Sequence, residues 1–593
     1  MSEHLVDRLL ASGARRGDAI GLATSRDGRV AISRDQVSAD LDPASVAKTI
    51  AAIDAELAPR WVMWDQRTAA TLVAHGIRLV RSWDLAAADR FVHGGWATSP
   101  ALIWARLHDL DPNTIPVERG PDLFNQIDPA VESASPIDPD GYLRASWSAG
   151  GWEDFDGGAV TWASLALRCA RLQRAATDTL PDPPRTLSAL RSESSIELLC
   201  SELAADGLPL DEARANELIA GYIGPRPTTQ QDEFDARAQR DAAVFAAAPG
   251  VGQVDLRSPG QVRTLLRRVG IEVPDTRAWR LKELRDRHPI VEALLTWRKA
   301  ERIESTFGYR WLDENVSGGR LRGVWSGCDG AAGRMTASAG LHNLPAELRD
   351  AVRAEPGYVF VRADLGQIEP RVLAVVSGDP KLAEATRDDD LYAPVATALG
   401  VPRDVAKVAV LGAMYGQTTG IGAEALRGLN AAYPVAMAYL ERADRSAQAA
   451  NDLRTFGGRL IRLSASSPSP NGTEDRAAVA ARGRFGRNAM VQGAAAEFFK
   501  VWALTVRARV APLDARIVLC LHDELLVHTP AEYADKVAAA VDAALQEAAA
   551  RWAPSSDGRS TTGRSDAGRS TTGHSAVRFV AETSVVTSWA DAK

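Results

Sequence analysis

The hydrophobic and polar positions of this chain change their period along its length, and each period predicts a different element. Residues 359–379, VFVRADLGQIEPRVLAVVSGD, begin as an apolar run of β type. We therefore predict a short buried strand that ends at Asp364. Pro370 suits the first turn of a following helix, where a missing N–H costs nothing. An acid at such a strand end can also be a helix cap or a surface ion pair.

A second apolar run makes a functional interpretation of Asp364 stronger. Residues 516–528, RIVLCLHDELLVH, are apolar at both ends and carry His522, Asp523 and Glu524 in the middle. Charged groups inside a buried strand are costly unless they are paired or bind a metal. A turn between two antiparallel strands would place Asp523 at the edge of a sheet, facing Asp364. Two such carboxylates can hold two Mg²⁺ ions about 3.5–4 Å apart, an arrangement that serves phosphoryl transfer.

Two helical patterns carry further candidate chemistry. Pro402 opens a stretch in which Arg403, Lys407, Leu411 and Tyr415 recur every four residues, so they share one helix face. Two cations, an apolar residue and an aromatic in that order match a footprint that runs from a triphosphate to a base, although a bundle helix with a basic stripe would look similar.

Residues 482–510 predict another helix, with Arg484, Asn488 and Gln492 on one face. Uncharged amides in series suit hydrogen bonds to a nucleic-acid backbone and to minor-groove edges.

Four segments then point to a family by their order. GRMTASAGLHNLP (333–345) precedes DLGQIEPR (364–371), RDVAKVAVLGAMYG (403–416) and LHDELLV (521–527). The last three resemble motifs A, B and C of the family A DNA polymerases, the bacterial DNA polymerase I type. The resemblance covers roughly residues 190–593. It implies a template-directed DNA polymerase that extends a primer 3′ end with dNTPs by two-metal phosphoryl transfer, in replication or repair.

The resemblance also implies a multidomain α/β (α+β) fold shaped like a right hand, with an antiparallel palm sheet and helical fingers and thumb. The expected parts are an exonuclease-like α/β domain (1–185), the thumb with connecting helices (186–345), the first part of the palm (346–390), the fingers (391–505) and the second part of the palm (506–593).

Roles for individual residues follow from the same resemblance. Asp364 and Asp523 are the expected catalytic residues and hold two Mg²⁺ ions, with Glu524 in an assisting role. The expected nucleotide-binding residues are Gln367, Glu369, Arg403, Lys407, Leu411 and Tyr415. The expected DNA-binding residues are Arg334, Asn343, Arg371, Arg484, Asn488, Gln492 and His522. A packed strand histidine is the alternative for His522, and Leu411 departs from the family's usual Phe or Tyr, which leaves the sugar contact open.

The N-terminal region departs from the nuclease that it resembles. A hairpin over residues 19–33, turning at Asp27–Gly28, and helices over 45–57 and 66–75 predict an α/β domain, followed by a linker at 180–186. The nuclease pattern needs an Asp-x-Glu on the first strand and a late Tyr-x-x-x-Asp. The early Asp54-Ala55-Glu56 lies in a helical stretch, residues 161–172 contain no Asp, and Asp65 stands alone. We therefore expect a scaffold domain without proofreading.

The last segments predict an insertion in a loop and a final strand. GRSTTG occurs at 558–563 and again at 568–573, within the polar stretch 554–575, which we expect to be disordered. Residues 576–589, AVRFVAETSVVTSW, return to a β-type pattern and predict the last palm strand.

Composition changes this interpretation little. The net charge of −7 is unusual for a protein that binds nucleic acid, but residues 253–345 hold 16 Lys and Arg against 11 Asp and Glu. The four cysteines have neither zinc-site nor disulfide spacing, and no signal peptide or membrane span is apparent. We expect a cytoplasmic, nucleoid-associated monomer whose partners are primer–template DNA and dNTPs, with no membrane contact.

Three alternatives differ from this interpretation in class. Single-subunit RNA polymerases use the same two Asp residues, but Glu369 and Glu524 favour the DNA branch. A nuclease would need acids that the N-terminal region lacks. A non-catalytic DNA-binding protein would be expected to have lost Asp364, Lys407 or Asp523, and all three are present.

Overall fold

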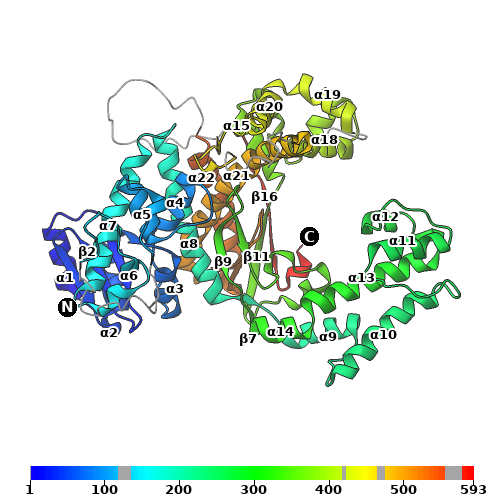
Figure 1. Cartoon of the computed structure of the whole chain (residues 1–593), viewed down its shortest axis with the longest axis horizontal. Helices are drawn as coiled ribbons and strands as arrows, with labels where there is room; N and C mark the ends of the chain where they lie inside the picture. The colour runs from blue at the N-terminus through cyan, green and yellow to red at the C-terminus, as the bar shows by residue number, and fades with distance from the viewer. Residues whose placement is uncertain (1, 118–134, 417–421, 464–474, 555–576, 593) are drawn as a thin grey trace, which may run out of the picture. The chain divides into compact units, whose positions relative to one another are not determined.

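The computed structural model describes residues 2–117, 135–416, 422–463, 475–554 and 577–592 (Figure 1). The predicted disorder of the repeat insertion falls on residues outside these ranges, apart from Pro554. The chain divides into two compact units. Unit 1 comprises Met1–Ala205, Trp325–Thr336 and Val361–Val585, and unit 2 comprises Asp206–Val324, Ala337–Phe360 and Val586–Lys593.

A five-stranded mixed sheet, in the order β3-β2-β1-β4-β5, organises the N-terminal part of unit 1. Its strands are β1 (Ala19–Thr24), β2 (Val30–Arg34), β3 (Val37–Leu41), β4 (Arg60–Met63) and β5 (Ser82–Asp84). Strands β1 and β2 form the predicted antiparallel hairpin, whereas β4 pairs with β1 and β5 in parallel. The helices around the sheet are α1 (Ser2–Ala11), α2 (Pro43–Leu57), α3 (Gln66–Ala74), α4 (Leu85–His93), α5 (Pro100–Leu107), α6 (Ala145–Ser148), α7 (Gly158–Thr177) and α8 (Pro183–Asp206).

Alternation along the strands divides the core of this sheet between its two faces. Val30 and Ile32 of β2 pack into one apolar cluster, and Ala31 between them packs into the other. Helix α7 lies against β1 so closely that a Cβ atom on Gly21 would stand 2.1 Å from the carbonyl oxygen of Ala163. Glycine is therefore required at this contact.

A four-stranded sheet, in the order β14-β15-β11-β16, carries the candidate catalytic residues that are described below. Its strands are β11 (Tyr358–Leu365), β14 (Arg516–Cys520), β15 (Glu524–Pro530) and β16 (Ala581–Val586). Strands β14 and β15 pair antiparallel, as predicted, and β16 is the predicted final strand. Helices α21 (Arg476–Val510) and α22 (Ala534–Trp552) pack on each other and on these strands.

The remaining helices of unit 1 lie between β11 and α21 in the chain. They are α15 (Ile368–Ser377), α16 (Pro380–Ala385), α17 (Tyr392–Leu399), α18 (Arg403–Tyr415), α19 (Gly422–Ala432) and α20 (Pro434–Gln448). Two short ribbons complete the unit, β9 (Trp325–Asp329) with β10 (Arg334–Ala337), and β12 (Leu453–Arg454) with β13 (Leu460–Ile461). Helix α18 ends at Gly416, whose φ of 68° is the left-handed conformation that glycine adopts readily.

Unit 2 is mainly helical. Its helices are α9 (Glu212–Ile223), α10 (Gln230–Ala246), α11 (Pro259–Arg268), α12 (Ala278–Lys282), α13 (Pro289–Phe307) and α14 (Tyr309–Asn315). A small sheet, β6-β8-β7, joins β6 (Leu208–Pro209), β8 (Arg320–Leu321) and β7 (Val316–Ser317). Helices α11 and α13 contribute Val262, Leu266, Ile290 and Leu294 to its core.

One local prediction was wrong. The predicted linker at 180–186 is shorter, because helix α8 already begins at Pro183. The two consecutive prolines that suggested a break stand in the first turn of α8, where neither needs an N–H group. Within the part of the chain that the structure describes, none of the helices combines the length and the apolar character that a membrane crossing requires.

Candidate active site

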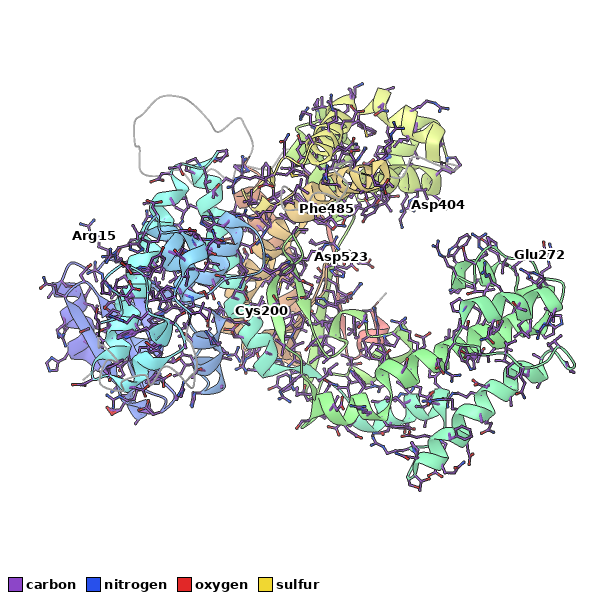
Figure 2. The ribbon with its side chains drawn as sticks, viewed as in Figure 1. Arg15, Cys200, Glu272, Asp404, Phe485 and Asp523 are labelled. Atoms are coloured by element: carbon purple, nitrogen blue, oxygen red, sulfur yellow. The ribbon has the colours of Figure 1, made fainter. Side chains whose placement is uncertain are left out.

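The two predicted catalytic carboxylates come together at one end of the four-stranded sheet β14-β15-β11-β16. Asp364 is the penultimate residue of β11, and Asp523 lies in the turn that joins β14 to β15. The backbone N–H of Leu365 donates to the carbonyl oxygen of Asp523 at 2.8 Å, so a direct main-chain hydrogen bond fixes the two segments together. Figure 2 marks Asp523 in this part of unit 1, with Asp404 and Phe485 on α18 and α21.

The proximity of these carboxylates disfavours their charged forms. Burial and the negative charge of Asp523 raise the pKa of Asp364 to about 6. Burial also raises the pKa of Asp523. A pair of acids that repel each other in this way is a site where a divalent cation would be stabilised, and carboxylate oxygens are the ligands that Mg²⁺ prefers. The donor set therefore fits a metal.

Arg362 is a member of this site that sequence reasoning missed. Its Nη2 atom lies 2.6 Å from Asp364 Oδ2, and its Nε atom lies 2.9 Å from Glu524 Oε1. The signal was present, because residues two apart on a strand point to the same face, which places Arg362 beside Asp364.

The expected assisting role of Glu524 in metal binding is not supported. Its side chain is buried and forms an ion pair with Arg362, which satisfies the charge that a metal would otherwise balance. Within the described ranges, no group of three or more acidic, His or Cys side chains is arranged to hold a metal ion. Asp364 and Asp523 thus remain the two candidate ligands.

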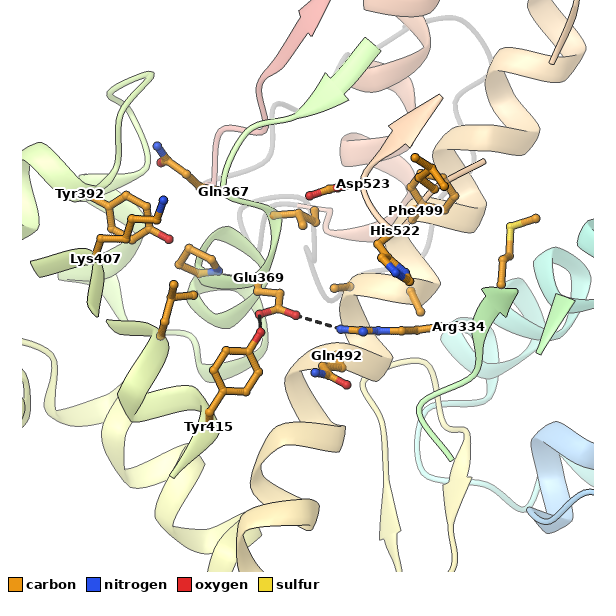
Figure 3. A pocket seen from close by; sticks show the side chains of 17 residues that line it. Arg334, Gln367, Glu369, Tyr392, Lys407, Tyr415, Gln492, Phe499, His522 and Asp523 are labelled. Carbon is orange, nitrogen blue, oxygen red and sulfur yellow. Dashed lines mark hydrogen bonds and ion pairs between the residues drawn. The ribbon is translucent and has the colours of Figure 1, made fainter. Parts of the chain in front are cut away.

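A cavity of about 430 Å³ opens beside Asp523 (Figure 3). It is lined by side chains from β10, from the turn between β14 and β15, from α15, α17 and α18, and from α21. The predicted residues that line it are Arg334, Gln367, Glu369, Lys407, Leu411, Tyr415, Gln492, His522 and Asp523. Residues from five separate motifs thus share one cavity, all within unit 1.

Glu369 lies at the centre of the polar network in this cavity (Figure 3). Tyr415 donates its hydroxyl to Glu369 Oε2 at 2.8 Å, and Arg334 Nη2 lies 3.1 Å from Oε1. Burial and the hydrogen bond to Glu369 raise the pKa of Tyr415 to about 12. The carboxylate therefore ties helix α18 and strand β10 to the first turn of α15.

The basic face of α18 is divided between a paired and an unpaired cation. Arg403 Nε lies 2.5 Å from Asp390 Oδ2, and this ion pair lowers the pKa of Asp390. Lys407 is exposed, lines the cavity and has no hydrogen-bond or ion-pair partner among the described residues. Lys407 is therefore the cation that is available to a ligand in this state.

Asp390 also holds the side chain of Gln367, the residue that precedes α15. Gln367 has φ 55°, a left-handed conformation that is rare outside glycine, and its Nε2 atom donates to Asp390 Oδ1 at 2.8 Å. Gln367 Oε1 accepts from the N–H of Leu391 at 2.8 Å. These two bonds hold the Gln367 side chain against the start of α17.

The predicted DNA-binding face of α21 is present as a helix face. Arg484 is exposed, has no partner among the residues described, and lies with its stem over Gly416, where a Cβ atom would stand 2.8 Å from Arg484 Cγ. Asn488 is half-buried, and its Oδ1 atom has no hydrogen-bond partner within the part of the chain that the structure describes. Gln492 reaches the cavity itself. Buried polar atoms are nearly always hydrogen-bonded, so the Asn488 oxygen marks a position where a ligand could supply a donor.

Two of the predicted DNA-binding residues lie elsewhere. Arg371 is fully buried and donates to the backbone carbonyls of Gly366, Thr386, Asp388, Asp389 and Arg578, so its guanidinium is not available to DNA and that prediction was wrong. Asn343 is an exposed residue of unit 2, where its carbonyl accepts from Arg302 at 3.0 Å.

His522 lines the cavity next to Asp523, as Figure 3 shows. Burial and the nearby charge of Arg334 lower its pKa, so the neutral imidazole predominates at neutral pH. The predicted alternative of a packed strand histidine does not describe its position, because His522 lies in the turn between β14 and β15 and not in a strand.

Tyr392 and Phe499 also line the cavity and were not predicted. Burial and the charge of Glu369 raise the pKa of Tyr392 to about 12. Neither aromatic residue was itself predicted to be in the site, since an aromatic residue at helical spacing looks like core.

Comparison with known proteins places this chain in a family. Residues 227–554, more than half of the chain, match DNA polymerase family A. The chain belongs to that family.

The relatives include DNA polymerase I of Chloroflexus aurantiacus, which is 32% identical over 291 residues, or 44% of this chain and 30% of the relative. A thermostable DNA polymerase I of Thermus thermophilus is 26% identical over 476 residues, or 71% of this chain and 53% of the relative. The chain thus spans about a third of the length of the DNA polymerase I relatives of Thermus filiformis and Chloroflexus aurantiacus, and 53% of that of the Thermus thermophilus relative.

A solved structure shares the fold over almost the whole chain. It is described as the POL domain of Pol1 from M. smegmatis in complex with DNA primer–template and dNTP. Its TM-score is 0.66 at 21% identity, with 99% of this chain and 98% of that chain covered. The mixed α/β fold predicted from the sequence is confirmed by this likeness.

Proposed function

We propose that this chain is a template-directed DNA polymerase that extends a primer 3′ end with dNTPs by two-metal phosphoryl transfer. The observation that carries the proposal is the meeting of Asp364 and Asp523 at one end of the palm sheet, beside a cavity lined by Lys407, Tyr415 and Gln492. Membership of DNA polymerase family A supports the same activity.

Asp364 and Asp523 would hold the Mg²⁺ ions. Bound there, the ions would lower the pKa of the primer 3′-hydroxyl and balance the charge that develops on the leaving pyrophosphate. The raised pKa of Asp364 means that acid competes with metal for this carboxylate, so activity should decline as the pH falls through about 6. Arg362 positions Asp364 and balances part of its charge until the metal arrives.

The face of α18 would bind the incoming nucleotide. Lys407 would bind the phosphates of the nucleotide directly. Arg403 would bind them as well once its ion pair with Asp390 is broken. Leu411 and Tyr415 would contact the sugar and the base, with Glu369 excluding a 2′-hydroxyl. The primer–template would be contacted by Arg334, by His522 and by the α21 face that carries Arg484, Asn488 and Gln492.

The remaining parts of the proposal concern the cell. We propose a role in replication or repair, action as a monomer on primer–template DNA in the cytoplasm at the nucleoid, and no proofreading. The proposed absence of proofreading rests on Asp54 and Asp65, two acids next to the N-terminal sheet. Asp54, in α2, accepts from Nε1 of Trp61 in β4 at 2.9 Å, and Asp65 caps α3 by accepting from the N–H of Arg67 at 2.9 Å. Each has a structural partner.

A primer-extension assay tests the proposal. The purified chain is incubated with Mg²⁺, a 5′-labelled primer and four templates that differ only in the first unpaired base. The expected result is addition of the complementary dNTP in each case, with little addition of the matching NTP. Addition that ignores the template, or NTP use equal to dNTP use, would refute the proposal in favour of a different transferase or of an RNA polymerase.

A further inference from the structure

A second cavity, of about 320 Å³, lies in the N-terminal sheet and is lined mainly by arginines. It opens where strands β1 and β4 begin. Asp65, the only candidate relic of a nuclease site, follows the other end of β4, so the two places are distinct. We call this cavity the arginine cavity and define it by Arg34, Arg60, Arg171, Arg174, Arg191 and Asp18.

Two of these arginines are already neutralised. Arg34 Nη2 lies 2.9 Å from Asp18 Oδ2, and Arg171 Nη2 lies 2.5 Å from Asp35 Oδ1. Among the described residues, Asp18 is the one acid that lines the cavity. Burial acts to raise its pKa, but hydrogen bonds from Arg15 and Arg34 outweigh burial and lower it. The acids near the cavity are therefore occupied.

The other three arginines have no acidic partner. Arg60, Arg174 and Arg191 come from three separate elements, β4, α7 and α8, and none forms an ion pair with any residue that the structure describes. Arg60 donates one hydrogen bond, to the carbonyl oxygen of Ser82 at 2.9 Å. Burial and the nearby charges of Arg191 and Arg81 lower the pKa of Arg60 to about 10. Burial and the charges of Arg174 and Arg81 lower that of Arg191 as well.

Three unpaired guanidinium groups that converge on one cavity repel one another, and a multivalent anion between them would remove that repulsion. Guanidinium forks match the geometry of phosphate oxygens and bind them in pairs of hydrogen bonds. Trp83 adds an apolar wall, since its Nε1 atom already donates to Gln173 at 2.8 Å. We infer that the arginine cavity binds a ligand that carries two or more linked phosphate groups.

The inference does not rest on the proposed polymerase activity, because none of these residues lines the cavity at Asp523. Linked phosphates occur both in free pyrophosphate and in a nucleic-acid backbone. The test therefore uses two probes, inorganic pyrophosphate and a 12-nucleotide single-stranded DNA, each titrated calorimetrically into the full chain in EDTA at low salt.

The test variant is Arg174→Gln with Arg191→Gln, both at exposed positions where a glutamine is tolerated. Its matched control is Arg8→Gln with Arg168→Gln, which removes the same charge from exposed positions of the same domain outside the cavity. Binding at Lys407 is common to both variants and cancels. Because a charged hydrogen bond contributes enough to change affinity about tenfold, the test variant should lose at least about tenfold in affinity relative to the control.

The melting temperature of the test variant without ligand should equal or exceed that of the wild type, because the substitutions relieve repulsion; the control variant is not used for this comparison, since Arg8 donates to the Ser38 carbonyl and Arg168 lies over the Trp104 ring. A loss confined to pyrophosphate would identify a free diphosphate or polyphosphate ligand, and a loss confined to the oligonucleotide would identify a backbone ligand; both support a phosphate site. Equal affinities of the two variants for both probes, or no binding of either probe by the wild type, would overturn the inference.

Discussion

Substitution of Glu369 removes the group that links three parts of the cavity. The side chain is 16% exposed and accepts from Tyr415 while pairing with Arg334. Glu369→Ala deletes both interactions, whereas Glu369→Gln keeps the volume and one acceptor but removes the charge. Hydrogen bonds to charged groups contribute about 1.5–3 kcal/mol each, and the 34% exposure of the Arg334 side chain places its pair at the low end.

The cost of Glu369→Ala should therefore exceed the roughly 0.3–1 kcal/mol that a helix N-terminal acid contributes through the dipole alone. Tyr415 provides an independent measure. Burial contributes most to the raised pKa of Tyr415, which is about 12, and Glu369 contributes next. In both variants the pKa of Tyr415 should fall by about one unit toward 10.0, which corresponds to about 1.4 kcal/mol.

The assay is an ultraviolet titration of tyrosinate, taken as the difference between each protein and its Tyr415→Phe counterpart. The functional arm compares kcat/KM for dNTP and NTP. If Glu369 excludes the 2′-hydroxyl by occupying space, Glu369→Ala should raise ribonucleotide use and Glu369→Gln should not. An unchanged Tyr415 pKa would refute the contact, and an unchanged dNTP to NTP ratio in Glu369→Ala would remove Glu369 from sugar selection.

Three further predictions follow from other parts of the chain. The pKa of Asp364 rises from 3.8 to about 6 on folding, so this group costs the metal-free protein stability as the pH rises from about 4 to 6. Asp523→Asn should accordingly raise the melting temperature in EDTA at pH 8, and less so at pH 5; a lower melting temperature at pH 8 contradicts the repulsion. A mismatched primer 3′ end should stay intact with Mg²⁺ and no dNTP, and shortening that survives Asp523→Asn would reveal a nuclease. Deletion of 558–575 should change melting temperature and extension rate little, and a large loss of either would give the repeat a role.

The sequence predicts those parts of the site whose signal is local. Asp364 and Asp523 interrupt apolar runs, and the face shared by Arg403, Lys407, Leu411 and Tyr415 follows from helical spacing alone. Hydrophobic periodicity does not show that these residues come together in one place. That expectation came from the family resemblance.

What the sequence could not predict depends on contacts between distant segments. Arg371 lies in a motif that suggests DNA contact, yet its guanidinium is taken up by carbonyl groups from residues 366, 386, 388, 389 and 578. The ion pairs Arg403–Asp390 and Arg362–Glu524 are likewise tertiary contacts. The arginine cavity gave no signal either, since its unpaired members come from β4, α7 and α8.

The central claim is that Asp364 and Asp523 act together as the metal-binding carboxylates of a polymerase. The most direct measurement is primer extension by Asp364→Asn and Asp523→Asn, with primer–template affinity measured in parallel. Glu582→Gln is the matched control, because Glu582 is an exposed acid whose charge also raises the pKa of Asp364 but which does not line the cavity. We predict that both Asp variants lose extension by at least about a thousandfold, corresponding to about 4 kcal/mol of lost transition-state stabilisation, and bind DNA normally, while Glu582→Gln extends primers at nearly the wild-type rate. Robust extension by either Asp variant would contradict the account.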